Sequence, residues 1–259
     1  MKTKLLIVVK TYPTLTTNYE ESVCTAGITE LGNWIRIYPV PFRKLSFDKQ
    51  YRKYDWIEID IVKNTSDFRP ESYYPKNLVT DVKILESIGT GNNWQKRKEL
   101  VLKNVYEDFK ILIDESKDKS KYKSIAVFKP HKILDFHITE YENIEWDKDK
   151  LDRLNQLKLF ENTIKPVDKI PYKFTYIFED KNKKHHTLMI EDWEIGALYR
   201  NTLLRHKGDK ILAIKDVIKK YKDEFISKKD LYFILGTTRV HHLVSKNPFI
   251  IIGVFYPPK

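Results

Sequence analysis

Residues 22–38 read SVCTAGITELGNWIRIY, from Ser22 to Tyr38. β-Branched and aromatic residues fill both ends of this stretch, and a Glu-Leu-Gly-Asn turn at 30–33 separates them. Branched side chains favour extended backbone, and glycine permits a tight turn, so the pattern is typical of a β-hairpin. The stretch therefore predicts two antiparallel strands joined by a short loop.

The segments on both sides of this hairpin also favour strands. The apolar run Leu5–Val9 suits a buried strand, and residues 56–62 alternate so that three isoleucines share one face. Further strands are expected near 79–85, 124–128, 133–138, 173–179, 186–190, 231–235 and 249–255, and helices over 92–116, 148–160, 192–205 and 210–226.

The helices are inserted among the strands and do not alternate with them, which predicts an α+β fold built mainly of antiparallel sheet. A chain of 259 residues makes one large domain or two small ones. We expect an N-terminal β-rich half over 1–120, which includes the helix 92–116, and a C-terminal α+β half over 121–259. The two halves can also form one compact unit.

Composition excludes several classes of protein. A mean hydropathy of −0.51 and an apolar run of only five residues near the N-terminus argue against a membrane partner and a signal peptide. One cysteine excludes an intrachain disulfide and a thiolate-rich zinc site. We therefore expect a cytoplasmic protein.

The net charge of +11 points to a polyanionic partner, most obviously nucleic acid. Only nine of the 47 basic residues are arginine. A lysine-rich, isoleucine-rich composition is also what an AT-rich genome encodes, so a merely basic protein is the alternative.

Three groups of short motifs follow one another in the order found in a known class of proteins. The chain resembles nucleic-acid-binding proteins with a dual OB-type domain, over about two thirds of its length. The matching motifs are Cys24-Thr25-Ala26-Gly27 with Gly32-Asn33-Trp34-Ile35-Arg36, then Ser124-Ile125-Ala126-Val127-Phe128-Lys129-Pro130, and finally Phe174-Thr175-Tyr176-Ile177-Phe178 with Glu191-Asp192-Trp193.

The resemblance implies one or two small OB-like barrels with inserted helices, whose sheet face and loops hold an oligonucleotide. We also expect a prokaryotic or viral origin. The sequence departs from the family pattern in its helix 92–116 and its helices at 192–226, and these departures bear on whether the second half is a barrel.

Arginine is scarce in this chain, so each arginine beside an aromatic residue is a candidate for contact with phosphate or a base. One such face combines the arginines of the first hundred residues with neighbouring aromatic residues: Arg36, Arg43, Arg69 and Arg97 with Trp34, Tyr38, Tyr73 and Trp94. The alternative places the aromatic rings in the core and pairs the arginines with carboxylates. Arg239, in a Gly-Thr-Thr-Arg turn after a strand, is a further candidate for phosphate contact.

A second candidate follows the glycine-rich segment 89–93. Lys96, Arg97 and Lys98 stand at the start of the expected helix 92–116, where cations oppose the helix dipole. An anion bound at that helix end would offset the repulsion. The alternative is an asparagine N-cap followed by a solvated basic face.

No spacing specifies a reaction, and we assign no catalytic residue, no metal site and no cofactor. Glu58, Asp60 and Lys63 resemble a nuclease motif only loosely, and Mg²⁺ would be the cofactor if they acted as one. Cys24 lies in an apolar strand, where a buried inert thiol is the usual outcome.

The leading hypothesis is a nucleic-acid-binding protein of low sequence specificity that contacts phosphates through basic side chains and bases through aromatic rings. Two alternatives are a nucleic-acid- or nucleotide-modifying enzyme, either a metal-dependent nuclease or a transferase, and a protein-interaction or defence adaptor with a protein partner.

Overall fold

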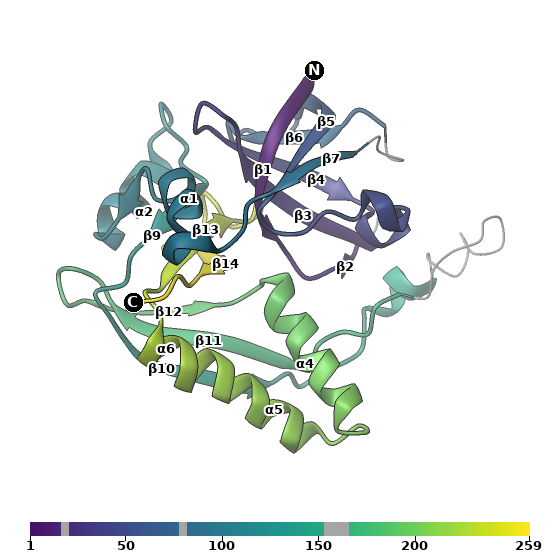
Figure 1. Ribbon diagram of the computed structural model, residues 1–259, viewed down its shortest axis with the longest axis vertical. Coiled ribbons are helices and arrows are strands. Elements are labelled where there is room, and N and C mark those ends of the chain that lie inside the picture. Colours follow the sequence, from purple (N-terminus) through teal and green to yellow (C-terminus); the bar gives the residue numbers. More distant parts are fainter. Residues whose placement is uncertain (17–20, 78–81, 153–165) are drawn as a thin grey trace.

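The hairpin at residues 22–38 forms two strands of a closed barrel in the computed structural model, which describes residues 1–16, 21–77, 82–152 and 166–259 (Figure 1). Strands β3 (Glu21–Ile28) and β4 (Trp34–Val40) pair antiparallel, with Ile28 opposite Trp34. The barrel is completed by β1 (Lys2–Lys10), β5 (Asp55–Lys63) and β6 (Ser72–Pro75).

The strand order β1-β3-β4-β6-β5 closes through the β1–β5 pair, and β4 and β6 run parallel. This is an OB-like barrel. Strands β2 (Thr14–Leu15) and β7 (Lys83–Ser87) extend the sheet, and two short 3₁₀ turns, η1 (Phe42–Lys44) and η2 (Phe47–Lys49), follow β4.

Side-chain alternation and one glycine position the barrel wall. Ile57, Ile59 and Ile61 on β5 all point into the core, as the sequence predicts. Gly27 on β3 lies so close to β1 that a Cβ atom there would stand 2.6 Å from the carbonyl oxygen of Leu6. A side chain at residue 27 would therefore force the two strands apart.

The second half of the chain builds two further sheets. One contains β8 (Val105–Tyr106), β9 (Ile125–Phe128), β13 (Tyr232–Thr237) and β14 (Phe249–Phe255), and the other contains β10 (Lys132–Glu140), β11 (Tyr172–Glu179) and β12 (His185–Met189). In the described part of this half, neither sheet closes on itself.

The helices of the second half share a core with these sheets, through α2 (Phe109–Lys117), α4 (Trp193–Arg205), α5 (Lys210–Ile218) and α6 (Phe225–Lys228). A π-helical stretch, Lys219–Glu224, joins α5 to α6, so the helix predicted over 210–226 is present with one irregular turn.

The predicted α+β class, dominated by antiparallel sheet, is confirmed. The single helix predicted over 92–116 is wrong, because α1 (Gly91–Val101) ends before strand β8 and α2 begins afterwards. Strand β8, which precedes residue 120, pairs with β9, which follows it.

Two predicted elements fall partly outside the described residues. The strand expected at 79–85 is described from Lys83 as β7, and the helix expected at 148–160 is described only over 148–152. Among the residues described, no helix combines the length and the apolar character needed to cross a bilayer.

Candidate nucleic-acid interface

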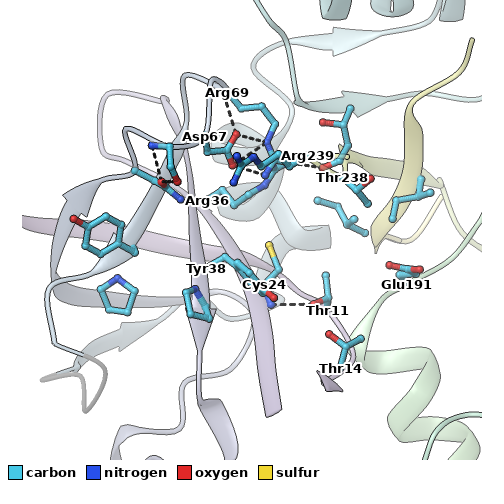
Figure 2. A pocket seen from close by; sticks show the side chains of 18 of the residues that line it. Thr11, Thr14, Cys24, Arg36, Tyr38, Asp67, Arg69, Glu191, Thr238 and Arg239 are labelled. Atoms are coloured by element: carbon cyan, nitrogen blue, oxygen red, sulfur yellow. Dashed lines mark hydrogen bonds and ion pairs between the residues drawn. The ribbon is translucent and has the colours of Figure 1, made fainter. Parts of the chain in front are cut away.

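A cleft of about 780 Å³ opens between the barrel and the ends of the β13–β14 pair. Three predicted arginines from distant parts of the sequence meet there: Arg36 from β4, Arg69 from the loop before β6, and Arg239 from the loop after β13 (Figure 2). We call it the arginine cleft; its charged lining residues are Arg36, Arg69, Lys76, Arg239, Asp67 and Glu191. Four cations thus face two carboxylates.

Arg69 is fixed by its own loop. Asp67 accepts hydrogen bonds from the Arg69 backbone N–H (3.1 Å) and from its Nε (2.9 Å) and Nη2 (2.5 Å), while Nη1 donates to the carbonyl of Thr237 (2.6 Å). Although desolvation opposes ionisation, the hydrogen bonds from Arg69 and Ser72 lower the pKa of Asp67 to about 2. Arg69 therefore connects the barrel loop to the end of β13. It also keeps the Asp67 carboxyl ionised and balances its negative charge.

Arg36 lies deeper, with only 3% of its surface exposed. Its Nη2 donates to the carbonyl of Ser124 (3.1 Å), but its buried Nη1 has no hydrogen-bond partner among the described residues. Burial lowers the pKa of Arg36, and the neighbouring charge of Arg69 lowers it further. A buried, unpaired guanidinium donor costs stability that a bound anion would return.

The remaining charged groups stand at the open side. Arg239 is exposed and makes no hydrogen bond or ion pair with the described residues. Glu191, which follows β12, faces into the cleft apart from Arg36 and Asp67 (Figure 2), and desolvation raises the pKa of its carboxyl. Sequence reasoning missed Glu191 as a site residue, although the quoted acidic-Trp turn contains it.

Six other predicted site residues lie outside this cleft. Arg43 pairs with Glu21 at 2.6 Å, and Tyr73 stacks under the Lys63 ammonium, 4.8 Å from the ring centroid. Trp94 is buried against Tyr54 and Phe255, so its ring is not available to stack on a base. Lys96 is exposed, and Lys98 is half-buried.

The backbone at residues 92–94 does not form the helix start on which the expected anion site depends. Asn92, Asn93 and Trp94 have φ angles of 48°, 53° and 64°, so a left-handed turn replaces the expected first helical turn. Arg97 instead donates to the carbonyl of Ile88 through Nε (2.9 Å) and Nη2 (2.6 Å). Its guanidinium therefore stabilises the folded chain at this turn.

The nuclease-like carboxylates each have a cation beside them. Asp60 pairs with the N-terminal ammonium at 2.6 Å and Glu58 with Lys2 at 3.5 Å, on the outer face of β5. Lys63 donates to the backbone carbonyl of Arg69. Over the described ranges, no three His, Cys, Asp or Glu side chains are grouped to hold a metal ion.

Cys24 lines the arginine cleft from β3, and desolvation raises the pKa of its thiol. A raised pKa leaves little thiolate at neutral pH, so we expect a slow reaction with a disulfide reagent in the folded protein and a fast one in denaturant. Cys24→Ala should cost about 1–2 kcal/mol of unfolding free energy. Fast labelling of the folded thiol at pH 7 would contradict this assignment.

Two family models match the chain, one over residues 1–103 (DUF8758) and one over residues 106–259 (DUF8757), and both are described as domains of unknown function. No curated protein matches the chain in sequence. One similar solved structure is a murine DNA-binding protein bound with double-stranded DNA. It shares 11% identity over 99% of this chain and 94% of that chain, with a TM-score of 0.33.

Proposed function

We propose that this chain, which belongs to the DUF8757 family through residues 106–259, binds nucleic acid through the phosphate backbone with low sequence specificity. The observation that carries the proposal is the convergence of Arg36, Arg69 and Arg239 on one cleft in a chain of net charge +11. Phosphate contacts supply most of the affinity of such proteins, and arginine suits them because its planar fork binds two oxygens.

The arrangement favours binding over catalysis. The two carboxylates of the cleft come from different sides, and Asp67 is already held by Arg69 (Figure 2). A metal-dependent nuclease needs carboxylates that converge on one cation. The carboxylates of this cleft therefore do not support the nuclease alternative.

The proposal is tested by binding of fluorescent single- and double-stranded oligonucleotides over a range of salt concentrations. If about five phosphates are neutralised, the slope of log K against log salt should be about −3.5 for single strands and about −4.5 for duplexes. Arg239→Ala should weaken binding and make the slope shallower by about one unit.

Lys96→Ala is the matched control, because Lys96 is an exposed cation that does not line the arginine cleft. It should leave both the affinity and the slope almost unchanged. Absence of binding at low salt, or equal losses in the two variants, would refute the cleft as the nucleic-acid interface.

A further inference from the structure

The arginine cleft is too small for a length of duplex. Its volume of about 780 Å³ falls within the range of about 300–1,000 Å³ that is typical of sites for small molecules. A strand lying along the surface could place only a nucleotide or so inside it. The cleft therefore has the dimensions of a site for one nucleotide unit.

One end of the cleft is built for a phosphate. Arg36 is almost fully buried, and its Nη1 has no partner among the residues the structure describes. Asp67 is paired with Arg69, and the buried Glu71 carboxylate, whose charge also acts on Arg36, does not line the cleft. A phosphate oxygen at Arg36 Nη1 would supply the missing partner, and Arg239 could reach the same group from the open side.

The other end offers an acceptor. The Glu191 carboxylate makes no hydrogen bond or ion pair with the described residues, and an ionised carboxylate can only accept. Guanine, cytosine and adenine carry amino donors, whereas thymine and uracil present carbonyl oxygens in their place. Tyr38 and Tyr74 are the aromatic residues, besides Tyr12, that line the cleft.

We infer that the arginine cleft binds a single nucleotide unit, with its phosphate at Arg36 and Arg239 and the amino edge of its base at Glu191. The inference rests on the proposed function and names the part of the nucleic acid that the cleft takes. Such a site would prefer certain bases at one nucleotide of a bound strand. The rest of the strand would still bind with low sequence specificity.

The test is calorimetric titration of the full chain with GMP, UMP, guanosine and inorganic phosphate. GMP should bind at least about tenfold more tightly than guanosine or phosphate, because only GMP occupies both ends. It should also bind more tightly than UMP. Glu191→Ala, which removes the acceptor, should abolish the difference between GMP and UMP. Arg239→Ala should weaken both by about tenfold, and Lys96→Ala should change neither.

Competition with a fluorescent oligonucleotide separates this inference from the proposed function. Displacement of the strand by GMP supports both. A strand that binds but is not displaced by GMP would overturn the single-nucleotide site and leave the proposed function standing. GMP binding without any strand binding would overturn the proposed function and assign the cleft to free nucleotides. Equal affinities for phosphate and GMP would reduce the site to an anion site and overturn the inference.

Discussion

Lys53→Met should lower the free energy of unfolding by about 3–5 kcal/mol, because it leaves a buried carboxylate without its cation. The side chains of Lys53 and Asp192 are 7% and 0% exposed, and the Lys53 ammonium lies 2.9 Å from Asp192 Oδ2 and 3.0 Å from Glu194 Oε2. Asp192 also caps α4 by accepting from the backbone N–H of Glu194. The variant would therefore weaken the contact between the barrel and the second half.

The loss should depend on pH. Desolvation already raises the pKa of Asp192 to about 6 against the lowering effect of Lys53, so removal of Lys53 should raise it further. When the pKa of a carboxyl is higher in the folded than in the unfolded protein, ionisation of that carboxyl destabilises the folded state. The folded protein is then most stable below the unfolded-state pKa, and this stability is lost as the pH rises through the folded-state pKa. Lys53→Met should therefore be less stable at pH 8 than at pH 5. Lys10, whose pKa desolvation lowers to about 8 with help from the Lys53 charge, faces the same cluster.

Denaturant unfolding measures the effect, with Lys2→Met as the control. Lys2 and Glu58 form an exposed pair, 77% and 41% exposed, so this variant should lose less than about 1 kcal/mol. Adding Asp192→Asn to Lys53→Met should restore part of the stability, since an amide keeps the helix cap without a buried charge. Equal losses for Lys53→Met and Lys2→Met would contradict the assignment.

Strands with a clear local pattern were predictable from the sequence. The hairpin at 22–38 follows from branched and aromatic residues on both sides of a glycine-containing turn. The buried face of β5 follows from the alternation of its isoleucines, which matches the two-residue period of a strand. The break in the helix at 92–116 was not predictable. A left-handed Trp94 is locally unfavourable, and it is held by packing against Tyr54, Phe255 and Tyr256, which come from distant segments.

The sequence indicated that arginines would form the site, but it did not indicate which residues meet in the cleft. Scarcity of arginine drew attention to Arg36, Arg69 and Arg239, yet Arg43 met the same criterion and pairs with Glu21 elsewhere. Only the strand order brings β4 next to the β6 loop, and only the tertiary contact with β13 adds Arg239. Glu191 carries no local signal that separates it from any other surface glutamate.

Arg97→Glu should lower the free energy of unfolding by about 2–4 kcal/mol, the reverse of what a helix-dipole argument predicts. The guanidinium carbon lies 3.8 Å from the Tyr54 ring centroid and 4.8 Å from that of Trp94, while two of its nitrogens donate to the Ile88 carbonyl. Charged hydrogen bonds contribute about 1.5–3 kcal/mol and cation–π contacts about 0.5–2 kcal/mol. A carboxylate at this position supplies neither contact.

Lys98→Glu separates the two arguments, because Lys98 is the next residue and its side chain makes no hydrogen bond or ion pair with the described residues. At an ordinary helix start, each replacement would stabilise the chain by about 0.3–1 kcal/mol. With a left-handed turn at 92–94 and a structural Arg97, only Lys98→Glu should stay near the parent stability, and Arg97→Lys should fall between the parent and Arg97→Glu. Thermal unfolding of the three variants decides the matter: an Arg97→Glu protein as stable as Lys98→Glu would show that the stacked guanidinium does not hold the turn.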